Sequence, residues 1–242
     1  MGMLYFLAGF QTGYIESVQM VYLFNGFYSS AILGYAFCAA SFSACLLEDG
    51  GHGYWYLAVQ KGNLKSYVRS KLLVCFLSGA LTMVFGVLLF AAMLQFHAPL
   101  FVETASMADL RQNDTFGFLL YPDTILLYFI CSAAVNGTLG GILAAFSAYL
   151  SLYEPQRLLT LCAPLAGFYF LENFMIDTLA LPECFNVWVV YGAGYSVFGN
   201  PLLNLVYGLT VTLLFWKLLE TLIYRKVRDE ICGITGKTGF WG

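Results

Sequence analysis

Five long segments of this chain consist almost entirely of apolar residues. They cover residues 23–47, 72–96, 124–152, 158–181 and 202–224. Each is long enough for a helix that crosses a bilayer core, which takes about 20 apolar residues. A helix also satisfies its own backbone hydrogen bonds inside lipid. We therefore predict an all-α polytopic membrane protein, with five clear transmembrane helices in one domain that spans residues 1–242.

The composition excludes several other classes of protein. The chain is 60% hydrophobic and 10% charged, whereas a soluble domain carries about 25% charged residues. It lacks the polar surface of a soluble enzyme and is too apolar to be disordered. The net charge of −3 and the absence of a basic face exclude a nucleic-acid partner. With two histidines and no C-x-x-C pair, we expect no metal site and interpret the seven cysteines as free thiols.

The positively charged residues indicate how the chain is oriented. If the spans alternate across the bilayer, ten of the eleven Lys and Arg residues fall on one side: Lys61, Lys65, Arg69, Lys71, Arg157, Lys217, Arg225, Lys226, Arg228 and Lys237. Cytoplasmic loops carry such an excess. We therefore place residues 48–71 and the tail at 225–242 in the cytoplasm, and residues 1–22, 97–123 and 182–201 outside. The predicted location is the plasma membrane, with several passes and a cytoplasmic C-terminus.

The N-terminal segment does not fit a simple five-span chain. Residues 1–10 are apolar but too short to cross a bilayer. An external N-terminus without a basic signal-peptide region is an unusual start. We therefore expect a sixth, N-terminal helix that is short or missing in this chain. In the alternative interpretation, residues 1–22 form an external segment that lies in the membrane interface.

The loop at 48–71 is the most informative stretch. An acidic pair is followed by a glycine cluster, an aromatic and apolar stretch, and then several cations. A short helix of this kind can dock into a groove of a partner, with its apolar side chains as anchors. The alternative is an interfacial loop, whose aromatic rings lie among lipid headgroups and whose cations meet anionic lipid. The residues alone do not separate these two interpretations.

The loop and the span after it also resemble a known family. The matching residues are Glu48, Gly53, Tyr54, Leu57, Gly62, Lys65, Tyr67 and Lys71, followed by FLSGAL at 76–81. In this pattern, residues 40–95 resemble the small permease subunits of ABC-2-type ATP-binding-cassette transporters of Gram-positive gut bacteria. The resemblance implies a bacterial exporter with six spans per permease, a second identical or homologous permease, and two copies of a cytoplasmic ABC ATPase. It makes residues 54–66 the coupling helix on which the ATPase sits.

The resemblance also assigns roles to particular residues. Those expected to couple the ATPase are Glu48, Gly53, Tyr54, Trp55, Leu57, Lys61, Lys65, Tyr67, Arg69 and Lys71. The chain itself has no P-loop, because the glycine required before Gly236-Lys237-Thr238 is replaced by Ile231. We therefore expect ATP and Mg²⁺ on the partner ATPase, no cofactor in this chain, and no enzymatic activity of its own.

Polar residues inside the predicted spans are candidates for a substrate path. Glu172 and Asn173 lie in the fourth span and Asn136 in the third, and ionisable groups at membrane depth are costly enough to suggest a function. In the alternative interpretation, Glu172 is protonated, or hydrogen-bonded to a residue such as Asn136, and fixes helix packing. Gly137 and Gly141, extended by Ala145 and Ala148, form a row of small residues that favours close packing within one subunit.

Two further alternatives stay open. The external segment 182–201 is either a re-entrant or surface-lying cap over the outer gate, or a plain interfacial loop. For the whole chain, the alternative functions are a secondary transporter and a membrane-bound immunity or binding protein that acts without an ATPase. No internal repeat supports the first of these.

Overall fold

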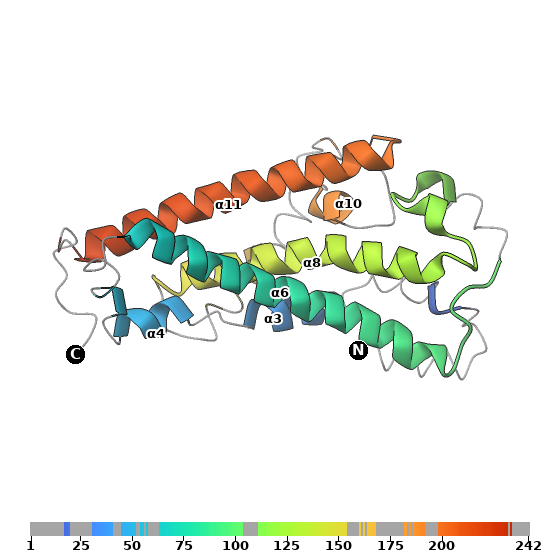
Figure 1. Cartoon of the computed structure of the whole chain (residues 1–242), viewed down its shortest axis with the longest axis horizontal. Coiled ribbons are helices and arrows are strands. Elements are labelled where there is room, and N and C mark those ends of the chain that lie inside the picture. The colour runs from blue at the N-terminus through green and yellow to red at the C-terminus, as the bar shows by residue number, and fades with distance from the viewer. Residues whose placement is uncertain are drawn as a thin grey trace.

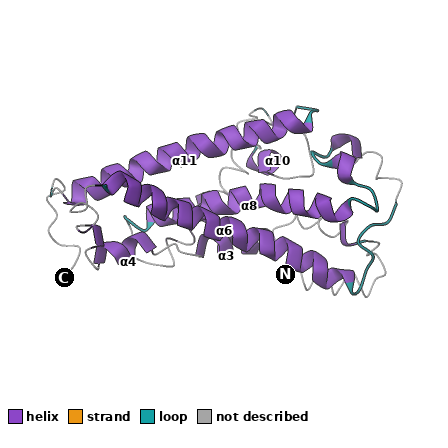
Figure 2. Cartoon of the chain, viewed as in Figure 1, coloured by secondary structure: helices purple, strands orange, loops and turns teal. Residues whose placement is uncertain are grey.

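The computed structural model describes part of the chain, and all of the regular structure in that part is helical. The described residues are 17–19, 31–40, 45–51, 54, 55, 57, 63–103, 111–153, 160, 162, 164–167, 182, 184, 186–191, 198–231 and 233. The named elements are α3 (Ala31–Ala40), α4 (Cys45–Gly51), α6 (Leu64–Gln95), η1 (Gly117–Leu119), α8 (Ile125–Leu150), α10 (Val187–Tyr191) and α11 (Pro201–Ile231). No β-strand occurs among these residues (Figure 2).

Three helices are long and apolar enough to cross a membrane. They are α6 with 32 residues, α8 with 26 and α11 with 31, so that even α8 extends over about 39 Å. They correspond to the second, third and fifth predicted spans. Within the first predicted span α3 and residues 45–47 of α4 are helical, and within the fourth residues 160, 162 and 164–167 are helical. The rest of those two spans, and residues 1–10, lie outside the described residues.

Two helices extend beyond their predicted ends. The prediction began the second span at Leu72, but α6 begins at Leu64 because the side chain of Asn63 accepts a hydrogen bond from the Ser66 backbone N–H at 3.1 Å. Likewise α11 runs on to Ile231 rather than ending at Tyr224. The prediction ended each span where the apolar residues end. Long Lys and Arg side chains, however, allow a helix to continue beyond the apolar layer, because their charged ends can reach water.

Helices α6 and α8 form an antiparallel pair with very close backbones. A Cβ atom added at Gly79 of α6 would lie 2.6 Å from the carbonyl oxygen of Gly140 in α8. One added at Gly141 would lie 2.8 Å from the carbonyl oxygen of Phe76. Both contacts lie within one chain, so the predicted packing of the small-residue row within a subunit is confirmed. Only glycine permits this approach.

Helix α11 runs alongside this pair, and the apolar core is divided along its length. The start of α6, the end of α8 and the end of α11 meet at one end of the bundle, near α4 (Figure 1). We call this the basic end, because it holds seven of the eight Lys and Arg residues that the structure describes: Lys65, Arg69, Lys71, Lys217, Arg225, Lys226 and Arg228. The eighth, Arg111, lies near η1 at the opposite end. Away from the basic end the ribbons of α6 and α11 diverge (Figure 1).

Candidate functional site

Asp49 joins α4 to the start of α6 at the basic end. Its carboxylate accepts a short hydrogen bond from the Tyr67 hydroxyl. The same oxygen lies 2.6 Å from Nζ of Lys71, and the Lys71 ammonium also lies 5.8 Å from the centre of the Tyr67 ring. Tyr67 and Lys71, both predicted to couple an ATPase, therefore have partners within this chain and hold α4 against α6.

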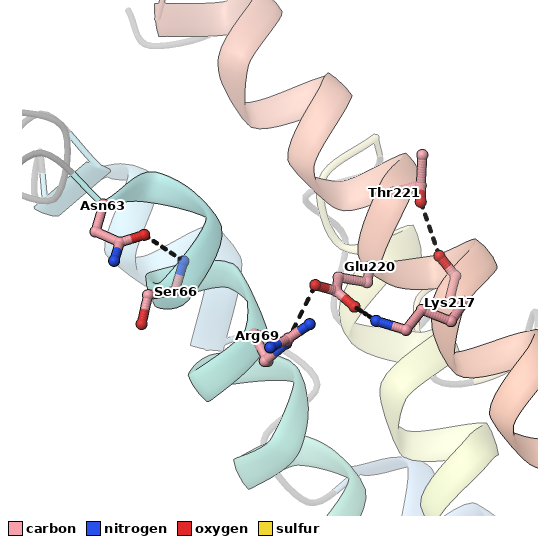
Figure 3. Close-up of polar contacts among 6 residues, drawn as sticks. All are labelled: Asn63, Ser66, Arg69, Lys217, Glu220 and Thr221. Carbon is pink, nitrogen blue, oxygen red and sulfur yellow. Dashed lines mark hydrogen bonds and ion pairs between the residues drawn. The ribbon is translucent and has the colours of Figure 1, made fainter.

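A second ion cluster joins α6 to α11. Nε of Arg69 lies 3.2 Å from one carboxylate oxygen of Glu220, and Nζ of Lys217 lies 2.8 Å from the other (Figure 3). The Glu220 side chain is only 5% exposed, whereas Arg69 and Lys217 are 56% and 63% exposed. The Glu220 carboxylate is therefore buried between two cations, and more than half of each cationic side chain is exposed.

Neither Glu220 nor Asp49 is among the predicted site residues. A local signal for Glu220 was present, since it follows Lys217 by three residues, which is one helical turn. Its contact with Arg69 joins residues 151 positions apart in the chain, and no spacing rule reaches that far.

The aromatic stretch between α4 and α6 has an inner and an outer part. Trp55 is 6% exposed and belongs to an apolar cluster built from the basic ends of α6, α8 and α11. Tyr54 and Leu57 are each 50% exposed. The prediction treated all three side chains alike, but the structure separates one that packs inward from two that face outward.

The other predicted coupling residues divide into two groups. Glu48 and Lys65 are exposed at the basic end. Gly53 and Lys61 lie outside the described residues. The predicted coupling helix at 54–66 overlaps the first turn of α6, because Asn63 caps that helix and Leu64 begins it. Residues 64–66 are therefore part of the long helix rather than of a separate short one.

Two thiols meet beside this cluster. Sγ of Cys45 in α4 lies 3.2 Å from Sγ of Cys75 in α6, and both cysteines are free thiols, as are the other cysteines that the structure describes. Among the residues that the structure describes, no group of three His, Cys, Asp or Glu side chains is placed to hold a metal ion.

Of the predicted substrate path, the structure describes Asn136 alone. Its side-chain amide donates to the carbonyl of Ser132 at 3.1 Å and accepts from the hydroxyl of Tyr35 in α3 at 3.4 Å. Tyr35 is 1% exposed and Asn136 is half-buried, so this is a partly buried polar link between α3 and α8. Glu172 and Asn173 lie outside the described residues, and their proposed relation to Asn136 stays a prediction.

Helix α10 lies deep within the bundle. Val190 and Tyr191 are buried in an apolar cluster with Tyr35, Leu139 and Leu143, and the two leucines stand at the middle of α8. The Tyr191 hydroxyl lies 2.9 Å from that of Thr212, which is about 16 Å along α11 from its first residue. Of the alternatives left open for residues 182–201, this position favours a re-entrant segment over an interfacial loop.

The opposite end is held by buried polar groups. Asp114 accepts hydrogen bonds from the Phe116 backbone N–H at 2.7 Å and from the Tyr128 hydroxyl at 2.8 Å. Asn204 of α11 donates to the Thr115 hydroxyl at 3.1 Å. Burial raises the pKa of Asp114 to about 6, although both hydrogen bonds favour its charged form. This end therefore contains a buried carboxyl group whose pKa lies above its ordinary value.

Comparisons with models of protein families, with curated proteins and with solved structures found no match. Membership of the ABC-2 permeases is therefore a proposal that rests on the residues and geometry of this chain.

Proposed function

We propose that this chain is the membrane-spanning permease subunit of an ATP-driven ABC exporter. The observation that carries the proposal is the division of the 54–57 stretch. Trp55 packs into the cluster shared by the three long helices, while Tyr54 and Leu57 face outward at the basic end. A partner that pushes on the outward side chains would move a residue that packs into the apolar cluster shared by the three helices.

The topology proposed with this function keeps the basic end in the cytoplasm. Seven cations of the described residues gather there, as the distribution of Lys and Arg in cytoplasmic loops requires. The C-terminal tail is then cytoplasmic, and α6, α8 and α11 are three of five spans, with a sixth N-terminal span expected from the resemblance. The proposed setting is a bacterial plasma membrane.

The proposed partners are two copies of an ABC ATPase and a second permease, identical or homologous. ATP and Mg²⁺ belong to the ATPase, and this chain contributes no nucleotide site. When the ATPases close on each other, residues 54–57 would be displaced. Asp49 would pass the displacement to α6 through Lys71, and Arg69 would pass it to α11 through Glu220.

This arrangement refines the roles of the predicted coupling residues. Tyr54, Leu57 and Lys65 are exposed and are proposed to touch the ATPase. Tyr67, Arg69 and Lys71 bond to acidic groups of this chain, so they are proposed to transmit the motion instead. Asn136, with Glu172 and Asn173, remains the proposed polar part of the substrate path.

The decisive experiment is affinity purification of the full-length tagged chain from its native membrane in mild detergent. We expect a nucleotide-hydrolysing subunit to co-purify, with vanadate-sensitive ATPase activity. Tyr54→Ala combined with Leu57→Asp is expected to reduce its recovery at least fivefold.

A matched control is available at the opposite end. Tyr121 is 49% exposed, against 50% for Tyr54. Tyr121→Ala combined with Phe118→Asp likewise replaces a tyrosine by alanine and a large exposed apolar residue by aspartate. This control should leave recovery unchanged. Absence of any ATPase from the wild-type preparation, or equal loss with both double variants, would overturn the proposal.

A further inference from the structure

The ion cluster between α6 and α11 has the features of a lipid headgroup site. We propose that Arg69 and Lys217, held by Glu220, bind the phosphate of an anionic phospholipid whose acyl chains lie along α6 and α11. This proposal shares with the proposed function the placement of both helices in the membrane, but it does not depend on an ATPase.

The charge of the cluster favours an anion. Two cations share one carboxylate, so the group keeps a net positive charge. Glu220 binds one nitrogen of each cation (Figure 3), whereas a guanidinium carries five N–H donors and an ammonium three. Both cationic side chains are more than half exposed and Glu220 is 5% exposed. The carboxylate therefore fixes the cations in place without enclosing them.

Further cations lie on the same rows of both helices. On α6, Lys65 precedes Arg69 by four residues, and on α11, Arg225 follows Lys217 by eight. All four are exposed. Residues four apart on a helix lie one above the other, so the two rows place four exposed cations at the basic end of α6 and α11.

Each row turns apolar toward the middle of the bundle. On α6 the row continues from Arg69 to Leu73 and Leu77, each 47% exposed. On α11 it continues from Lys217 to Leu213 and Leu209, which are 65% and 55% exposed. Cations followed by exposed leucines at the same spacing match the order of a phospholipid, with its phosphate above its acyl chains.

An aromatic pair joins α6 and α11 close to Lys217. The rings of Phe76 in α6 and Trp216 in α11 pack edge to face with centres 5.5 Å apart. Trp216 directly precedes Lys217, so an indole lies beside the cationic group, as is common at the boundary between headgroups and hydrocarbon. A soluble anion would use the cations but would have no use for the leucine rows, and this favours a lipid.

The test uses the full-length chain purified in detergent. Phosphatidylglycerol, phosphatidylcholine or inorganic phosphate is added, and thermal unfolding and the lipid retained in native mass spectrometry are measured. We expect phosphatidylglycerol to raise the Tm of the wild type by several degrees and to be retained, while the other two additives have no effect. Arg69→Gln combined with Lys217→Gln should reduce retention at least fivefold.

The matched control removes the same charge from the same end of the bundle. Lys226 pairs with Glu230 at 3.0 Å and Arg228 with Asp229 at 3.3 Å, so Lys226→Gln combined with Arg228→Gln should keep phosphatidylglycerol bound. Equal loss in both double variants would mean that only total charge matters, and the proposal would be wrong. Stabilisation by inorganic phosphate to the same extent would also overturn it, because the site would then bind a free anion.

Glu220→Gln separates binding from a merely structural ion pair, and it serves even where the double variant does not fold. It removes the only negative charge of the cluster but keeps both cations. Retention of phosphatidylglycerol equal to or above that of the wild type supports the lipid site. Loss of retention together with a lower Tm would show that the cluster only holds α6 to α11.

Discussion

The two ends of the helix bundle are stabilised by different kinds of interaction. At the basic end, ion pairs with partly exposed cations join α4, α6 and α11 through Asp49 and Glu220. At the opposite end, Asp114 is buried and bonded to a backbone N–H and a tyrosine hydroxyl. The first kind is weakened by salt because exposed ion pairs are screened. The second is insensitive to salt but changes with pH, so the two ends can be loosened separately.

The largest effect is expected where the two ends are joined, at the contact between α6 and α8. Gly79→Leu should prevent close packing and lower the free energy of unfolding by about 3 kcal/mol or more, because overpacking forces the backbones apart. Gly86→Leu on the same helix is the control, since a Cβ at Gly86 meets nothing within 4 Å. Thermal unfolding in detergent measures both. Equal Tm values would contradict the glycine contact.

The next largest effect concerns the opposite end and its pH dependence. Because the pKa of Asp114 is raised to about 6 from 3.8, the folded chain holds a proton between these values that the unfolded chain has released. Stability therefore falls as the pH rises through this window and levels off above it, a change of about 3 kcal/mol in total.

Asp114→Asn tests this directly, since an amide stays neutral and can still accept the Phe116 N–H. We expect the Tm of this variant to vary less between pH 4.5 and 7 than that of the wild type. Asp123→Asn changes an exposed acid nearby and should keep the wild-type profile. Identical profiles for the wild type and Asp114→Asn would show that Asp114 is not the titrating group.

A smaller effect is expected at the basic end. Asp49→Asn should destabilise the chain by about 1 kcal/mol, because Lys71 is 34% exposed and can turn to solvent when its partner is lost. The loss should shrink in 0.5 M salt, which already screens the pair in the wild type. The same salt should leave the difference between the wild type and Asp114→Asn unchanged. A salt response of equal size at both ends would remove the distinction between them.

The smallest effect is a chemical one that leaves stability nearly unchanged. In a variant whose other five cysteines are replaced by alanine, Cys45 and Cys75 should form a disulfide rapidly with a copper–phenanthroline oxidant, since their sulfur atoms lie 3.2 Å apart. Mass spectrometry of the linked peptides measures the yield. A variant that keeps Cys38 and Cys75 instead is the control. Slow linkage of Cys45 to Cys75 would show that α4 does not pack against α6.

Sequence reasoning predicted the long helices better than the site. Three of the five predicted spans correspond to long apolar helices, and the row at Gly137 and Gly141 packs as predicted. Apolar length and small-residue spacing are properties of a single segment. Helix ends were missed where a polar cap decided them, as Asn63 does for α6. The partners of Arg69 and Lys71 were missed because Glu220 and Asp49 come from other helices. The inward position of Trp55 was not predicted, because three apolar residues so close together in the sequence do not show which side chain packs into the core.

The depth of α10 has a consequence for any solute that crosses this bundle. Val190 and Tyr191 pack between α8 and α11, and the Tyr191 hydroxyl is hydrogen-bonded to that of Thr212. Moving these two side chains out into water would cost about 3–6 kcal/mol. At rest, α10 would then be displaced in fewer than about one molecule in a hundred. The short helix α10 is then the element that closes this part of the bundle between α8 and α11.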